Sequence, residues 1–165
     1  MPYALELAVD GAAAAVRRVW RELDDAGISY MARSGARPID RAAFESELTR
    51  VAAETAPLPI TLASVGLFPT VAVFLAPTVT AELLDLHADV HRRFRHLGTA
   101  PWRYYAPGVW VPHCTLASDL APDQFATALE IARRARLPLE CRLVEIGIVE
   151  FRPVNQLISR ALGGR

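Results

Sequence analysis

The strongest constraint on the fold is an order of strand-like and helix-like segments that occurs twice in the chain. The stretch "YALELAVDGAAAAV" near the start resembles "VAVFLAPTVTAELL" over residues 71–84, and each combines a strand, a turn and the beginning of a helix. Likewise, "LPITLASVGLF" resembles "LPLECRLVEIGIVEF", and each follows a helical segment. Two such halves predict an α+β fold of two similar lobes, with antiparallel sheets and helices packed on the outside.

The spacing of apolar residues sets the expected element bounds. Strands are predicted where these residues alternate or run continuously, and helices where they recur every three or four positions. The expected strands are 3–9, 58–68, 70–76, 110–117, 137–151 and 155–162. The expected helices are 11–27, 40–56, 80–98 and 122–135, with a polar loop over 31–40. Gly27 is expected to end the first helix and Asp40 to cap the second.

Length and composition favour one folded domain, residues 1–165. Hydrophobic residues make up 52% of the chain, and 18 basic residues balance 18 acidic ones, so no overall charge attracts nucleic acid or membranes. The opening "MPYALELAVD" reads as a strand and not as a secretion leader, and no apolar run is long enough for a membrane span. We therefore expect a cytoplasmic protein. Cys114 and Cys141 lie in apolar strand-like runs and are expected to be free thiols.

The stretch "WVPHCTLA", residues 110–117, places polar groups in an otherwise apolar strand. Side chains of a strand alternate between its two faces, so His113, Thr115 and Ala117 are expected on the same side. The structural interpretation is a histidine whose hydrogen-bonding needs are met by a neighbouring group in the core. The functional interpretation is that an imidazole and a hydroxyl are directed at the same point.

With its flanking segments, "VPHCTL" resembles the second of two His-x-Thr motifs in the 2′-5′ RNA ligase-like branch of the two-histidine phosphoesterases. The resemblance extends over almost the whole chain, from "YALEL" through "LPITLASVGLFP" to the closing strands. It implies two lobes of antiparallel sheet, related by a pseudo-two-fold axis and separated by a groove. Each lobe carries one motif in that family.

The resemblance also implies the chemistry of the site. Members of the family hydrolyse or form RNA phosphodiesters, often through 2′,3′-cyclic phosphates, and need neither a metal nor another cofactor. One imidazole takes a proton and the other gives one, because the pKa of imidazole lies near neutrality. The hydroxyl two residues later can bind phosphate oxygens. His113 and Thr115 are therefore the expected catalytic residues, and the expected partner is an RNA end or a small nucleotide phosphate.

The first motif departs from the family pattern. Its counterpart is "RPIDRA", residues 37–42, where Ile39 takes the place of the histidine and Arg41 the place of Ser or Thr. An isoleucine cannot transfer a proton. We expect the segment of Ile39 to lie across the pseudo-two-fold axis from His113, and catalysis to be weakened.

Four further residues are candidates for substrate binding. Arg37 and Arg41 could contact phosphate through their guanidinium groups, although Arg41 could equally be a solvated residue in the first turn of a helix. Tyr104 and Tyr105 could line the groove or supply an acid, or could simply pack there. His87 and His91, in "HADVH", lack the glutamate of the metalloprotease pattern and are expected on an ordinary surface helix.

Three functions remain compatible with the sequence. The first is a phosphoesterase with weak or altered catalysis. The second is a non-catalytic module that binds nucleotides or RNA ends and has lost the chemistry. The third is a structural or interaction protein whose groove is vestigial.

Overall fold

The computed structural model describes residues 3–28, 41–69, 72–97, 103–150 and 155–164. The strands are β1 (Tyr3–Asp10), β2 (Leu58–Phe68), β3 (Ala72–Pro77), β4 (Cys114–Ser118), β5 (Leu139–Glu150) and β6 (Asn155–Ala161). The helices are α1 (Ala13–Asp25), α2 (Arg41–Glu54), α3 (Ala81–Phe94) and α4 (Gln124–Ala132), with a 3₁₀ turn η1 (Arg103–Tyr105). The predicted α+β class and the predicted type of each element are confirmed.

Local sequence accounts for the helix bounds. Val16, Val19 and Leu23 form one buried stripe on α1, and Gly27, with φ of +68°, ends the helix as predicted. The Thr80 hydroxyl accepts the Leu83 N–H at 3.3 Å and so caps α3. The expected cap of α2, Asp40, lies outside the described residues. Within the described part of the chain, none of the helices has the length and apolar content to cross a membrane.

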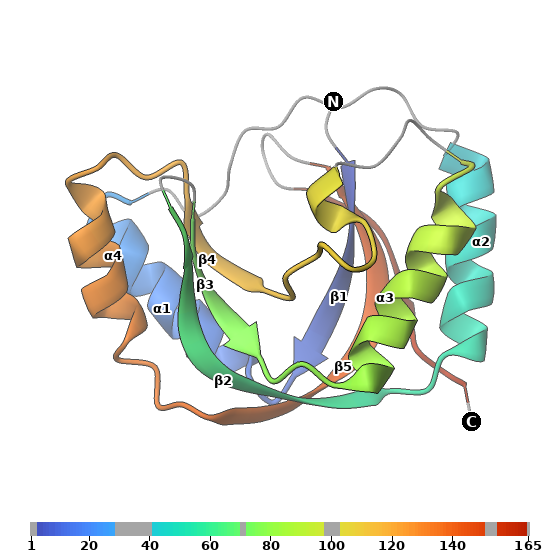
Figure 1. Cartoon of the computed structure of the whole chain (residues 1–165), viewed down its shortest axis with the longest axis horizontal. Helices are drawn as coiled ribbons and strands as arrows, with labels where there is room; N and C mark the ends of the chain where they lie inside the picture. Colours follow the sequence, from blue (N-terminus) through green and yellow to red (C-terminus); the bar gives the residue numbers. More distant parts are fainter. Residues whose placement is uncertain (1–2, 29–40, 70–71, 98–102, 151–154, 165) are drawn as a thin grey trace.

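All strand pairs are antiparallel and join one continuous six-stranded sheet with the order β1-β5-β2-β3-β4, in which β6 also pairs with β5. The sheet is strongly curved, and β2 and β5 run along its base (Figure 1). Helices α1 and α4 pack together at one end of the curve, where they contact β3 and β4, whereas α2 packs on β5, β6 and α3 at the other end. We call these halves the β4 lobe and the β6 lobe.

The strand registers repeat between the lobes with a constant offset. Ile60 of β2 pairs with Cys141 of β5, which lies 81 positions later, so this pair sits on the pseudo-two-fold axis. The same offset relates the bulge after Leu62 in the β2–β3 pair to the bulge after Leu143 in the β5–β1 pair. The internal repeat predicted from the sequence is therefore reproduced in the hydrogen-bonding pattern of the β2–β3 and β5–β1 pairs.

The strand registers set the residue-level equivalence of the repeat. The shared Leu-Pro dipeptides align Leu58 with Leu137, an offset of 79, whereas the registers require Leu58 to correspond to Leu139. Strand pairing and bulge position set the equivalence in space, and a shared dipeptide at the edge of a strand does not constrain either of them.

The core lies between the sheet and its outer helices. One face of the sheet carries buried apolar side chains that join those of all four helices in one cluster; its strand members include Ile60, Leu62, Val73, Leu75, Leu143, Ile146 and Ile148. Because paired residues share a face, the registers assign the alternate residues of each strand to the opposite side, which we call the inner face. The inner faces of the two lobes look toward each other across the curve of the sheet (Figure 1).

The end of the chain closes over α2. The N–H groups of Gly163 and Gly164 donate to the carbonyl oxygens of Ala52 and Thr55, both at 2.9 Å. These bonds satisfy carbonyl groups that the last turn of the helix leaves without an intrahelical partner. A Cβ atom on Gly164 would lie 2.6 Å from the carbonyl oxygen of Glu54, whereas a Cβ atom on Gly163 would meet nothing within 4 Å.

We therefore expect Gly164→Ala to lower the free energy of unfolding by about 1–3 kcal/mol, because the added methyl group collides with rigid backbone. Gly163→Ala is the matched control and is expected to change stability by less than about 0.5 kcal/mol. Urea unfolding of the two variants measures both values. Equal stability of the two variants would show that the chain end does not pack on α2 as described.

Candidate functional site

His113 lies immediately before β4 and not inside it. The predicted strand 110–117 begins only at Cys114, because Pro112 has no N–H to donate to a neighbouring strand and the N–H of Trp110 donates to the Ala106 carbonyl oxygen at 3.0 Å. The imidazole therefore sits where the chain enters the edge strand of the sheet.

A β-bulge decides which residues of the motif share a face. Thr115 pairs with Phe74, and Ala117 pairs with Val73, so Leu116 is the extra residue. Val73 and Phe74 are neighbours on one strand and point to opposite faces. Ala117 is therefore buried on the core side, and the prediction that it shares the face of Thr115 is wrong.

The ring of His113 has a defined orientation. Its Nδ1 atom lies 2.6 Å from the carbonyl oxygen of Val111. A carbonyl oxygen can only accept a hydrogen bond, so Nδ1 carries the proton in this contact. In the neutral ring Nε2 then has the free lone pair, and this atom can accept a proton.

Aromatic rings from β2 and β3 hold the other side of the imidazole. The edge-on ring of Phe68 lies 5.0 Å from the imidazole, and the ring of Phe74 lies 5.6 Å from it, both measured between centroids. The two phenylalanine rings contact each other at 4.4 Å. Gly66, which pairs with Phe74, makes room for this arrangement, since a Cβ atom there would lie 2.3 Å from Cε2 of Phe74.

The two candidate tyrosines differ in position. The ring centroid of Tyr105 lies 6.1 Å from that of His113, and burial of the phenol raises the pKa of Tyr105, so the group is a proton donor near neutral pH. The hydroxyl of Tyr104 instead accepts a hydrogen bond from Arg103 at 2.7 Å, and the Arg103 guanidinium lies 4.7 Å from its ring. Tyr105 is thus the tyrosine that the structure brings to the imidazole.

The candidate arginines are not brought to His113 in the described part of the structure. Arg41 is the first residue of α2 and is exposed, as the alternative interpretation of this residue expects. Arg37 and Ile39 lie outside the described residues. The predicted juxtaposition of Ile39 and His113 stays a prediction.

Cys114, between the two motif residues, has no nucleophilic role at neutral pH. Its burial, reinforced by the neighbouring Cys141, raises the pKa of its thiol to about 11. Both cysteines are free, as predicted. The thiol group therefore stays protonated and packs as an apolar side chain.

The sequence did not indicate a role for His87. It was expected on an ordinary surface helix, yet its ring is half-buried and stacks on Trp110, with centroids 3.9 Å apart and planes 9° apart. Burial lowers the pKa of His87, the nearby His91 lowers it further, and a hydrogen bond to the main chain of Tyr105 acts in the opposite direction. Its spacing with His91 in "HADVH" was the only signal, and it pointed to a metal instead.

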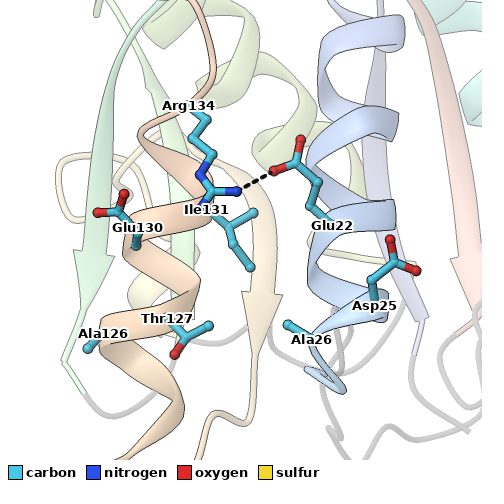
Figure 2. A pocket seen from close by; sticks show the side chains of 8 residues that line it. All are labelled: Glu22, Asp25, Ala26, Ala126, Thr127, Glu130, Ile131 and Arg134. Carbon is cyan, nitrogen blue, oxygen red and sulfur yellow. Dashed lines mark hydrogen bonds and ion pairs between the residues drawn. The ribbon is translucent and has the colours of Figure 1, made fainter.

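A hollow between α1 and α4 is not an alternative centre for this chemistry. A shallow hollow of about 620 Å³ lies between α1 and α4, on the outer side of the β4 lobe (Figure 2). Its polar lining is Glu22, Asp25, Thr127, Glu130 and Arg134, which includes no imidazole. Among the described residues, no three His, Cys, Asp or Glu side chains are grouped so that they could hold a metal ion.

If His113 binds the phosphate that the family resemblance implies, Gly66→Ala should weaken that binding by about tenfold, because the new methyl group displaces the Phe74 ring that packs beside the imidazole. The double variant Gly66→Ala/Phe74→Leu frees the space again and is expected to recover part of the affinity. Titration calorimetry with adenosine 2′,3′-cyclic phosphate measures both. Unchanged affinity in Gly66→Ala would show that the aromatic rings have no influence on binding at His113.

Comparisons with known proteins agree with this architecture. A sequence model described as the 2′-5′ RNA ligase superfamily matches residues 29–155. The crystal structure of TT0787 of Thermus thermophilus is similar over 100% of both chains, with a TM-score of 0.65 and 18% sequence identity. A search of curated proteins finds no match.

The structural similarity, at this identity, shows the fold, and the family match covers most of the chain. The inner-face motif, the two lobes with repeated registers and the sequence match all lead to the same assignment. The chain belongs to the 2′-5′ RNA ligase superfamily.

Proposed function

We propose that this protein binds the phosphate of an RNA end or a small nucleotide at His113 and Thr115, and that its turnover of phosphodiesters is weak. The observation that carries the proposal is the orientation of His113, whose Nδ1 atom contacts the Val111 carbonyl oxygen at 2.6 Å while aromatic rings pack beside it. A ring held in this way presents one nitrogen, Nε2, for proton transfer.

Thr115 supplies the second part of the proposed site. Because Thr115 pairs with Phe74, its side chain lies on the inner face of the sheet, where it is half-buried. A threonine hydroxyl can donate to a phosphate oxygen and accept from another group. With Nε2 of His113, it could hold a phosphate without any cofactor, which fits the metal-free chemistry expected from the family resemblance.

Weak turnover follows from the loss of the first motif. Opening a cyclic phosphate needs one group that accepts a proton and another that donates one, and each is worth about 10²–10⁴-fold in rate. Ile39 in place of a histidine removes one of them, which corresponds to about 3–5 kcal/mol of barrier lowering. Tyr105 is the side chain best suited to replace the donor, since the pKa of its phenol is raised and its ring lies near His113.

The proposed substrate contacts include the remaining candidates. Arg37 and Arg41 offer guanidinium donors that suit a phosphate. Tyr104 is an exposed residue of η1 and could contact the nucleoside. These assignments rest on the chemistry of the side chains and on their place in the sequence near the two motif segments.

A purely binding module is the second candidate function. Phosphate binding by a hydroxyl group and an imidazole requires no proton transfer, so affinity can persist when turnover is lost. The arrangement of Phe68, Phe74 and His113 disfavours a purely structural role, because a vestigial site has no need of an imidazole on the inner face.

The test combines binding and turnover of adenosine 2′,3′-cyclic phosphate. We expect measurable affinity and slow or undetectable hydrolysis, with affinity lowered about tenfold by His113→Ala and by Thr115→Val, since each removes a hydrogen bond to a charged group. The exposed His96→Ala is the matched control and should leave affinity unchanged.

Two outcomes would contradict the proposal. Rapid turnover that His113→Ala abolishes would show that the enzyme is intact and that another residue has replaced the first histidine. Absence of binding, both to this nucleotide and to an RNA with a 2′,3′-cyclic end, would exclude a phosphate site at His113.

A further inference from the structure

The segment 103–113, which we call the arm, carries both Tyr105 and His113. It begins with η1. A turn follows, in which the N–H groups of Val109 and Trp110 both donate to the Ala106 carbonyl oxygen at 3.0 Å. Residues 106–113 belong to no strand or helix, so the sheet ladder does not fix them. The position of the arm depends on side-chain contacts with the rest of the lobes.

One side chain of α3 contacts the arm at two points. The His87 ring stacks on Trp110 at 3.9 Å, and the same ring forms a hydrogen bond with the main chain of Tyr105. Trp110 is itself half-buried and packs against the hydrophobic core. His87 therefore holds η1, which carries Tyr105, and it also holds Trp110, which precedes Val111 and His113 in the chain.

We propose that His87 is a positioning residue of the phosphate site, which sets the arm so that Tyr105 and His113 lie together. This inference rests on the proposed function. His87 acts through the arm, and it is Tyr105, at 6.1 Å from the His113 ring, that completes the site.

The charge state of His87 supports this role. A neutral ring stacks on an indole without the cost of burying a charge, and burial and His91 both lower the pKa of His87. His91 faces it from the same helix, with its ring 6.2 Å from that of His87, and its buried Nε2 atom has no hydrogen-bond partner among the residues that the structure describes. From the arm, the groups next to His87 are the indole of Trp110 and the main chain of Tyr105, neither of which carries a charge.

Three substitutions separate the two contacts. His87→Ala removes both, His87→Phe keeps a flat ring over Trp110, and His87→Gln keeps a donor for the main chain of Tyr105. The exposed His96→Ala, just beyond the end of α3, is the matched control. Unfolding curves establish the temperature at which every variant is fully folded, and all other measurements are made there.

The first readout needs no ligand. Amide hydrogen exchange of residues 103–113 should become faster in His87→Ala, with partial recovery in His87→Phe and His87→Gln, whereas β2 and β3 should exchange as in the unaltered protein. Unchanged exchange of the arm in His87→Ala would overturn the proposal, even if the protein binds no phosphate at all.

The second readout is affinity for adenosine 2′,3′-cyclic phosphate, whose single negative charge stays constant between pH 5 and 8. His87→Ala should weaken binding about tenfold or more at pH 7.5, as expected when a contacting group shifts by a fraction of an ångström. If hydrogen exchange of the arm becomes faster in His87→Ala but the affinity is unchanged, the role of His87 is purely structural. That result would contradict the proposal. If the unaltered protein does not bind the nucleotide, the proposed function fails, whereas hydrogen exchange still tests the contacts of His87.

The third readout is the pH dependence of tryptophan fluorescence, because a protonated histidine stacked on an indole quenches it. The folded-state pKa of His87 lies below its unfolded value, so the neutral stacked form is fully populated above the ordinary histidine range and is lost as pH falls through the folded pKa. The unaltered protein should show this transition below the usual midpoint, and His87→Gln should lack it. A transition of equal size in His87→Gln would contradict the stack.

Discussion

The pairing of β2 with β5 about the pair Ile60–Cys141 is the constraint on which the other features depend. It joins the two halves of the chain into one sheet, and it relates β2 to β5 so that β3 lies beside β2 as β1 lies beside β5. All four helices pack on one side of this sheet, which leaves the other side of both lobes free to face inward. The His113–Thr115 motif, at the start of the edge strand β4, thereby lies on the side of the sheet that faces the opposite lobe.

The type and order of the elements could be predicted because short-range patterns determine them. The apolar stripe of α1 and its stop at Gly27 are local signals, and the structure reproduces both. Features that depend on contacts between distant segments could not be predicted. The bulge at Leu116 reverses the face of Ala117, and the strand registers shift the repeat by two residues, because both depend on neighbouring strands.

The site shows the same division between local and long-range information. The motif residues His113 and Thr115 were found from the sequence, since their spacing is local. The rings of Phe68 and Phe74, the room made by Gly66 and the stack of His87 on Trp110 come from other strands and from α3, and no spacing in the sequence indicates them. In physical terms, the motif provides an imidazole and a hydroxyl, a local contact with the Val111 carbonyl oxygen orients the imidazole, and long-range packing places aromatic rings beside it.

The most direct test of this account is the tautomer of His113, read from the nitrogen chemical shifts of its imidazole by NMR in the unaltered protein, with His113→Ala for assignment. The account predicts that Nδ1 carries the proton, that Nε2 is unprotonated in the neutral ring, and that adenosine 2′,3′-cyclic phosphate shifts the Nε2 signal. A proton on Nε2 in the neutral free protein, or an Nε2 signal that saturating nucleotide leaves unchanged, would contradict it.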